Sequence, residues 1–194
     1  MKMLKIGVLI SGRGSNLQAL IDASECRDIP AEISVVISNK SDAYGLERAK
    51  KHNIPAVFIN PKDFPDKNFY EEKIVETLKK YNVGLVCLAG YMKIVGKVVL
   101  TEYKRKMINI HPSLLPKYPG LHAQKQALED KAKVSGATVH FVDEGCDTGP
   151  ILLQAEVPVL ENDTEESLSS RILEQEHKIY PEAVRLFAEG KLKF

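Results

Sequence analysis

The chain lacks the cysteine and histidine patterns that indicate a disulfide framework or a metal site. It has three cysteines in 194 residues, Cys26, Cys87 and Cys146, and no C-x-x-C pair. Its five histidines form no H-x-x-H or similar ligand pair. We therefore expect neither disulfides nor a bound metal, and we expect Cys87, which lies in an apolar run, to be part of the core.

The chain also lacks a strong charge of either sign and any long hydrophobic run. Its 27 Lys and Arg residues against 26 Asp and Glu give a net charge of +1, without the basic excess typical of nucleic-acid binding. The apolar runs are too short to span a membrane, and the first residues lead into a short strand rather than a signal peptide. We expect a cytoplasmic protein that binds small molecules, with no nucleic-acid or membrane partner.

What the sequence does contain is a globular composition, with 44% hydrophobic and 27% charged residues. Short apolar runs alternate with longer amphipathic ones through the first half. Strands are expected over residues 6–10, 33–37, 56–59, 84–89 and 107–110, and helices over residues 16–23, 43–52, 68–81 and 97–105. This alternation is typical of a parallel sheet with helices on both faces.

The pattern changes after His111. The expected elements are a loop over residues 112–120, a helix near 124–129, two antiparallel strands over 137–142 and 151–160, and a helix over 165–188. Thr164 is a plausible N-cap of the last helix, and Pro181 should start, kink or break a segment inside it. No repeat or linker divides the chain. The prediction is one Rossmann-like α/β domain, a mostly parallel twisted sheet with a C-terminal antiparallel extension.

The strongest chemical signal is the segment N-I-H-P-S-L-L-P, residues 109–116. Asn109 and His111 are two residues apart at the end of a predicted strand, so both side chains leave the same face. Pro112 ends the strand because it has no N–H for the ladder. An amide and an imidazole side by side are what a developing oxyanion needs, although an isolated N-x-H is more often only packed at a strand end.

A second segment, S-G-R-G-S-N over residues 11–16, joins the first strand to the first helix. Its glycines would let a phosphate approach the helix N-terminus, with Ser15 and Asn16 as donors. The motif is not a complete dinucleotide-binding fingerprint, because Leu17 replaces its third glycine. A tight structural turn with Asn16 as the helix cap is the alternative.

Asp147 lies in a turn dense with glycine between the two late strands. It is either a turn residue that bonds its own backbone or, if close to His111, a carboxylate that raises the pKa of the imidazole and orients the ring. His122 and His140 are weaker candidates, and His140 is expected in the core or on a sheet face. For Glu176 and His177, on the final helix, the default expectation is a solvated face.

Taken together, these segments resemble the phosphoribosylglycinamide formyltransferases, the folate-dependent enzymes of purine synthesis. The resemblance spans essentially the whole chain. It rests on residues 10–19, 88–92, 109–116, 118–122, 147–151 and 175–181. The N-x-H-P-S-L-L-P segment is shared with other formyl-folate enzymes, including methionyl-tRNA formyltransferase. The G-S-N loop with the Q-E-H helix is more specific to the glycinamide enzymes.

The resemblance implies transfer of a formyl group from the co-substrate 10-formyltetrahydrofolate to the amine of 5-phosphoribosylglycinamide, giving formylglycinamide ribonucleotide for IMP synthesis, with no metal. The amine would attack directly and form a tetrahedral intermediate. Asn109 and a protonated His111 would stabilise its oxygen, at roughly 3–4 kcal/mol for one such donor. Asp147 would raise the pKa of His111 and, through a water, help to move the proton.

The resemblance also implies the substrate contacts. The ribonucleotide phosphate and ribose would be held by Gly14, Ser15, Asn16 and Glu176. Folate would contact Lys67, Met92, Lys93, Ile94, Val95, Asn109 and Val142. We therefore expect one formyltransferase domain over residues 1–194, with nucleotide-phosphate binding in residues 1–100 and catalysis and folate binding in residues 101–194. Leu173 and Lys93 depart from residues common in the family.

Two alternative functions remain open at this point. One is another formyl-folate enzyme, although the additional domain of a tRNA formyltransferase or of a formyltetrahydrofolate hydrolase has no room in this chain. The other is a non-catalytic sensor of a phosphoribosyl ligand, which would not need Asn109, His111 and Asp147 together. The sequence leaves the oligomeric state open, a homodimer included.

Overall fold

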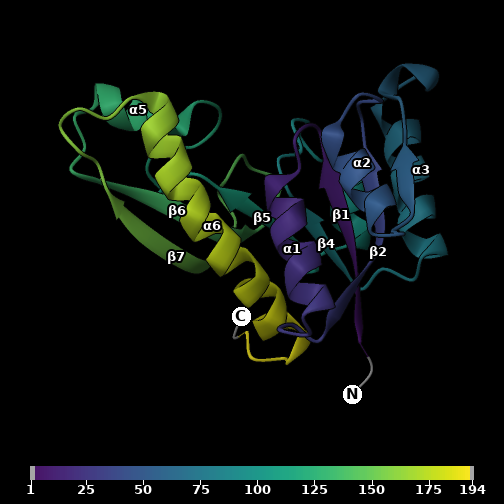
Figure 1. Ribbon diagram of the computed structural model, residues 1–194. Helices are drawn as coiled ribbons and strands as arrows, with labels where there is room; N and C mark the ends of the chain where they lie inside the picture. The colour runs from purple at the N-terminus through teal and green to yellow at the C-terminus, as the bar shows by residue number, and fades with distance from the viewer. Residues whose placement is uncertain (1–2, 193–194) are drawn as a thin grey trace.

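The strands form one sheet in the order β3-β2-β1-β4-β5-β6-β7. In the computed structural model, which describes residues 3–192, they are β1 (Leu4–Ile10), β2 (Ala31–Ser38), β3 (Ala56–Phe58), β4 (Leu85–Leu88), β5 (Met107–His111), β6 (Val134–Phe141) and β7 (Ile151–Pro158). Neighbours from β3 to β5 are parallel, whereas β6 pairs antiparallel with β5 and with β7. The predicted parallel sheet with an antiparallel extension is confirmed (Figure 1).

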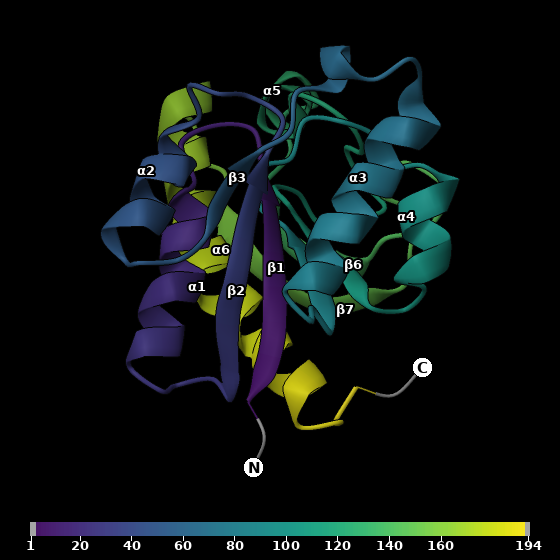
Figure 2. The ribbon, with the colours of Figure 1, turned by 90° about the vertical axis from the view of Figure 1, so that its right-hand side faces the viewer.

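Helices cover both faces of the sheet because the strand residues alternate between two apolar clusters. The helices are α1 (Ser15–Glu25), α2 (Tyr44–Lys51), α3 (Lys67–Lys80), α4 (Lys97–Glu102), α5 (Ala123–Glu129) and α6 (Glu165–Ala188), with a 3-10 turn at Pro61–Asp63. Val8 and Ile10 pack in one cluster with α1, α2, α5 and α6, while Leu9 packs in the other with α3 and α4. Figure 2 shows α1 and α2 on one side of the strands and α3 and α4 on the other.

The last helix begins where the sequence predicts it. The Thr164 hydroxyl accepts a hydrogen bond from the Ser167 N–H at 3.2 Å, and the Ser167 hydroxyl accepts one from the Thr164 N–H at 2.9 Å, which makes a capping box. Pro181, however, lies inside α6, which continues to Ala188. Of the predicted start, kink or break, a start or a break at Pro181 is wrong, because packing of α6 against α1, β6 and β7 offsets one lost backbone bond.

The topology brings three loops to one edge of the sheet. β1 and β4 are neighbours at the point where the strand order reverses, and β5 follows β4. The loops after β1 and β4 touch, since the Ser11 N–H donates to the Gly90 carbonyl at 3.0 Å. Ligands of such sheets bind beyond the carboxyl ends of the strands at this point. Within residues 3–192, no helix has the length and apolar character needed to cross a membrane.

Candidate active site

Three of the predicted site residues meet at the end of β5. Asn109 and His111 leave the strand on one face, as the alternation predicts. The Asn109 Nδ2 lies 3.4 Å from Asp147 Oδ1, and the His111 Nδ1 lies 3.3 Å from Asp147 Oδ2. The His111 side chain is 6% exposed and that of Asp147 is 12% exposed. The fold thus places an amide, an imidazole and a carboxylate in one water-poor site.

The turn before β7 aims the Asp147 carboxylate at this site. The side chain that bonds the turn's own backbone is that of Asp143, which accepts from the Gly145 N–H at 3.0 Å and from the Thr148 hydroxyl at 2.7 Å. Asp147 has a φ of 56°, and its Oδ2 accepts from the Gly120 N–H at 2.8 Å. The interpretation of Asp147 as an ordinary turn residue is therefore wrong.

Asp147 is a carboxylate at neutral pH. Burial by itself would raise its pKa, but the hydrogen bond from His140, the Gly120 N–H and the charges of the His111 and His140 rings lower the pKa to about 2. The site therefore contains one fixed negative charge beside two imidazoles.

Both ring nitrogens of His111 face hydrogen-bond acceptors. Its Nε2 lies 2.9 Å from the Tyr118 carbonyl oxygen, and its Nδ1 faces Asp147. Only the doubly protonated ring can donate to both. Burial nevertheless keeps the pKa of His111 below its ordinary value, against the raising effects of the Tyr118 carbonyl and Asp147. The predicted raising effect of Asp147 on the His111 pKa is thus present, but the loss of hydration of the buried ring outweighs it and the net shift is downward.

His140 is a fourth member of this group (Asn109, His111, His140 and Asp147), which we call the catalytic cluster after the role that the sequence predicts for the other three. Its Nε2 lies 3.4 Å from Asp147 Oδ1 and 3.3 Å from Asn109 Nδ2, and its Nδ1 lies 2.8 Å from the Phe141 carbonyl oxygen. The ring is 2% exposed, so its predicted burial is confirmed. Its contacts were missed. The signal was in the strand pairing, since β6 places His140 directly opposite Asn109 on β5.

A cleft of about 440 Å³ opens over the catalytic cluster. Its walls include the predicted folate residues Met92, Lys93, Ile94, Val95 and Val142. They also include Asn109, which is predicted both for catalysis and for contact with the folate. Lys67 lines an adjoining hollow instead, where Met92, Lys93 and Ile94 form part of the wall. The structure therefore brings most of the predicted folate contacts and the catalytic cluster to the same cleft.

The glycine loop after β1 turns tightly into α1. Gly14 is the N-cap residue with a φ of 70°, and a Cβ there would lie 2.9 Å from the Gly45 Cα. Asn16 is not the cap, because α1 already begins at Ser15. Among the described residues no side chain caps this helix. The first-turn N–H groups therefore point to a site that suits an anion.

Glu176 joins this loop from the far end of the chain. The Asn16 Nδ2 donates to Glu176 Oε2 at 2.7 Å. The Glu176 side chain is buried, which raises its pKa, while the bond from Asn16 lowers it. The default expectation of a solvated helix face is thus wrong for Glu176. The Asn16 Oδ1 is also buried and, within residues 3–192, has no hydrogen-bond partner.

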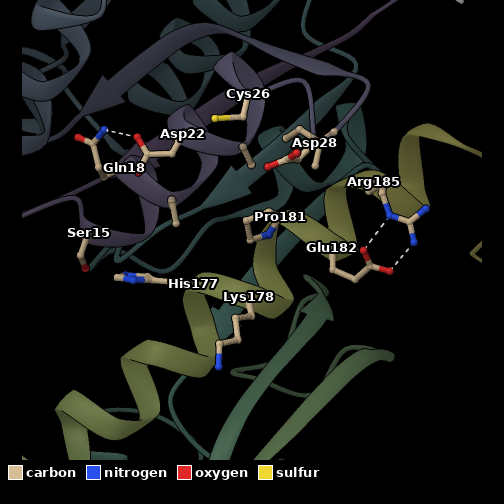
Figure 3. Close-up of a pocket in the computed structure, with 13 residues that line it drawn as sticks. Ser15, Gln18, Asp22, Cys26, Asp28, His177, Lys178, Pro181, Glu182 and Arg185 are labelled. Atoms are coloured by element: carbon tan, nitrogen blue, oxygen red, sulfur yellow. Dashed lines mark hydrogen bonds and ion pairs between the residues drawn. The ribbon is translucent and has the colours of Figure 1, made fainter.

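The predicted phosphate residues do not line the cleft over the catalytic cluster. Ser15 lines a separate groove of about 490 Å³ between α1 and α6, and Figure 3 shows its side chain beside His177 there. Gly14, Asn16 and Glu176 line neither this groove nor that cleft. Across the part of the chain that the structure describes, no group of three or more His, Cys, Asp or Glu side chains is arranged to hold a metal ion.

Comparison with known proteins identifies the family. A family model described as formyl transferase matches residues 4–184. The chain belongs to the formyl transferase family. It is 44% identical to the phosphoribosylglycinamide formyltransferase of Escherichia coli (strain K12), with 98% of this chain and 90% of that protein covered. The enzyme of the same name from Haemophilus influenzae is 48% identical over the same shares.

Longer relatives and solved structures agree with this family. The trifunctional purine biosynthetic protein adenosine-3 of Drosophila pseudoobscura pseudoobscura is 52% identical over 97% of this chain, which spans only 14% of that protein's length. The crystal structure of glycinamide ribonucleotide transformylase 1 from Symbiobacterium toebii has a TM-score of 0.98 and 54% identity, and covers 100% of this chain and 91% of that one. The fold predicted from the sequence is the fold of this crystal structure.

Proposed function

We propose that this chain transfers the formyl group of 10-formyltetrahydrofolate to the amine of 5-phosphoribosylglycinamide in purine biosynthesis. The observation on which this depends most is the convergence of Asn109, His111 and Asp147 at a cleft that residues 92–95 also line. The relatives named phosphoribosylglycinamide formyltransferase support the choice of substrate. The folate supplies the formyl group, and the chain's own residues do the rest.

Asn109 and His111 are placed to stabilise the formyl oxygen. That oxygen gains negative charge as the amine attacks, and one preorganised donor contributes about 3–4 kcal/mol to the transition state. The distances from both side chains to Asp147, 3.3 to 3.4 Å, are long for hydrogen bonds. Little interaction is therefore lost when these donors turn toward a substrate oxygen, and such contacts commonly tighten only once substrate is bound.

Asp147 has two roles in this proposal. Its charge favours the protonated form of His111 against the effect of burial. With a pKa of about 2 it also stays ionised, so it can accept the proton of the attacking amine through a water and return it toward the leaving folate nitrogen. The charge on the reacting oxygen is offset by Asn109 and His111, so the proposed chemistry requires no metal.

The ribonucleotide contacts would come from both ends of the chain. The backbone N–H groups at Gly14, Ser15 and Asn16 suit the phosphate. Glu176 would accept hydrogen bonds from the ribose hydroxyls, with Asn16 holding its carboxylate in place. The proposed nucleotide-phosphate half, residues 1–100, and the proposed catalytic and folate half, residues 101–194, are therefore not strictly separate, because Glu176 in the second half would bind the ribose.

The folate would fit the wall of residues 92–95 and Val142. The side chains of Met92 and Ile94 are 62% and 74% exposed, so they offer apolar surface to a pteridine ring. Residues 92–95 lie outside the sheet, and the Met92 N–H binds the Ser11 hydroxyl, which leaves the backbone groups of residues 93–95 available for the edge of that ring. Lys67 and Lys93, at the adjoining hollow, suit the negative charge of a glutamate tail.

We further propose that the partners are these two small molecules and that the reaction takes place in the cytoplasm. Three free cysteines, Cys26, Cys87 and Cys146, are in keeping with a reducing compartment. Self-association as a homodimer is the open alternative to a monomer, and sedimentation of the purified protein decides between them.

The test is a spectrophotometric assay with a 10-formyl-folate analogue whose absorbance changes on deformylation, with and without the ribonucleotide. We expect deformylation only when the ribonucleotide is present. Deformylation without it would indicate a hydrolase and overturn the transferase proposal. No reaction in either case, from folded protein, would favour the sensor hypothesis instead.

A further inference from the structure

Glu71 on α3 is a buried carboxylate that the proposed chemistry does not use. Its side chain is 3% exposed, and its Oε1 accepts a hydrogen bond from the Gly96 N–H at 2.6 Å. The Lys67 Nζ lies 3.7 Å from the same oxygen. Gly96 directly follows residues 91–95, which we call the cleft segment. Glu71 therefore connects the end of the cleft segment to Lys67, and both had been assigned to the folate.

The cleft segment depends on contacts from outside for its shape, because it has no helix or strand of its own. At its start, the Met92 N–H donates to the Ser11 hydroxyl at 2.8 Å, and the Tyr91 and Tyr70 hydroxyls lie 2.7 Å apart. At its end, Glu71 holds Gly96. Since Tyr70 and Glu71 are adjacent in α3, one turn of that helix holds both ends of the segment.

The backbone at Gly96 lies unusually close to the carboxylate. A Cβ at this position would lie 2.6 Å from Glu71 Oε1 and 2.9 Å from the Lys67 Cε. The absence of a side chain at Gly96 is what permits this approach. The contact is therefore a direct one between the cleft segment and the carboxylate, with no room for a bridging group.

Stability alone is a poor explanation for a carboxylate here. The other oxygen, Glu71 Oε2, is buried and, within the described part of the chain, has no hydrogen-bond partner. Burying a carboxylate that is only half paired costs free energy, whereas an apolar side chain of similar size would not. A buried polar group that costs stability in this way is expected where it has a function in a binding or catalytic site.

We propose that Glu71 is a positioning residue for the folate. It fixes the end of the cleft segment through Gly96 and keeps the Lys67 ammonium beside that end. This inference rests on the proposed function. Glu71 does not touch the catalytic cluster or the phosphate loop in any contact that the structure records. It should therefore set the affinity for folate and leave the ribonucleotide and the chemical step unchanged.

The test compares Glu71→Ala with Glu71→Gln. We measure kcat, KM for both substrates, and the Kd of the 10-formyl-folate analogue by titration calorimetry. Glu71→Ala should raise the folate KM and Kd about tenfold, the effect of losing one hydrogen bond to a charged group. Its kcat and ribonucleotide KM should stay within about twofold. Glu71→Gln keeps an oxygen for the Gly96 N–H and should recover most of the folate affinity.

Thr77→Ala is the matched control. Thr77 is also buried on α3, and its hydroxyl donates to the Lys73 carbonyl at 2.8 Å within the helix. This variant should lower the melting temperature without raising the folate KM. An equal rise of the folate KM in Thr77→Ala would overturn the proposal, as would unchanged folate Kd in Glu71→Ala or an equal rise of both KM values.

The proposed function and the role of Glu71 can be refuted separately. If the wild-type protein transfers no formyl group to the ribonucleotide, the proposed function fails. If the wild type is active and both Glu71 variants bind folate normally, the proposed function stands and only the role of Glu71 is refuted.

Discussion

The two walls of the cleft are built differently. The catalytic cluster is on β5, β6 and the turn before β7, and His111 and His140 are 5% and 2% exposed. The cleft segment has no regular structure and exposes Met92 and Ile94 widely. Groups that do chemistry must be held within a fraction of an ångström, and the sheet provides that rigidity. Side chains that only bind the substrate can be on a loop, provided that contacts from neighbouring elements fix the shape of that loop.

This comparison predicts that changes in the cluster lower kcat, whereas changes at the anchors raise the folate KM. The largest effect should come from Asp147→Asn, which removes the charge that partly offsets burial at His111 and the group proposed to move the proton. We expect kcat to fall about a thousandfold, within the range of general acid–base catalysis. Ribonucleotide binding, measured by calorimetry, should be nearly unchanged. A comparable loss of ribonucleotide binding would refute the role of Asp147 in the chemistry.

Asp143→Asn is the control for this change. Asp143 is in the same turn, but its carboxylate binds Gly145 and Thr148 rather than the cluster. The amide keeps an oxygen for both donors, so kcat should change by only about a few fold. An effect as large as that of Asp147→Asn would mean that the turn's shape, and not the charge of Asp147, matters.

The next effect in size should come from Asn109→Ala, which removes one of the two donors proposed for the formyl oxygen. We expect kcat to fall about a hundredfold with both KM values within a few fold, as for loss of one oxyanion donor. Steady-state kinetics with each substrate varied in turn measures this. A variant that changed the folate KM and spared kcat would place Asn109 with the binding wall instead.

The pKa of His111 sharpens the comparison within the cluster. The charge of Asp147 raises this pKa and that of His140 lowers it, while burial keeps the net value below 6.5. Asp147→Asn should therefore lower the pKa of His111 further, and His140→Asn should raise it. Titration of the His111 ring resonances by NMR gives the sign of the pKa shift in each variant. Shifts in the same direction would contradict the charge arrangement described here.

The lowered pKa of His111 also makes the free energy of unfolding depend on pH. Because the folded pKa of His111 lies below its ordinary value, the neutral ring stabilises the fold above pH 6.5, and this contribution is lost as the pH falls through the folded pKa. Asp147 acts likewise at lower pH, between 3.8 and about 2. Both groups therefore favour unfolding in acid, and Asp147→Asn should flatten the pH dependence of urea unfolding below pH 4.

The smallest effect should come from Ser11→Ala at the start of the cleft segment. The Ser11 hydroxyl accepts from the Met92 N–H and donates to Asn39 Oδ1. Two anchors remain when it is lost, so the folate KM should rise only about threefold, less than in Glu71→Ala. A larger rise than in Glu71→Ala would show that Ser11 is the main anchor.

Much of the fold could be predicted from the chain alone. The alternation of apolar runs located the strands and helices, and the Thr164 cap located the start of α6 because capping is a local interaction. Pro181 was less predictable, since its effect depends on how firmly α6 is packed. The alternative interpretation of Asn16 as a helix cap was wrong, because Gly14 takes that position through its left-handed backbone.

The site was predictable where it followed from strand geometry and less so where it depended on tertiary contacts. The shared face of Asn109 and His111 follows from alternation alone. The contact with Asp147 depends on the turn before β7, and the role of His140 on its register opposite Asn109. The net pKa shift of His111 depends on burial, and the contact of Glu71 with Gly96 on the packing of α3. Neither leaves a local pattern in the sequence.

The most direct test of the account is one set of steady-state measurements on Asp147→Asn and Glu71→Ala, with kcat and both KM values determined for each. We expect opposite results: Asp147→Asn loses kcat and keeps its substrate affinities, while Glu71→Ala keeps kcat and loses folate affinity. If both variants changed the same parameter, the division between a catalytic wall and an anchored binding wall would be wrong.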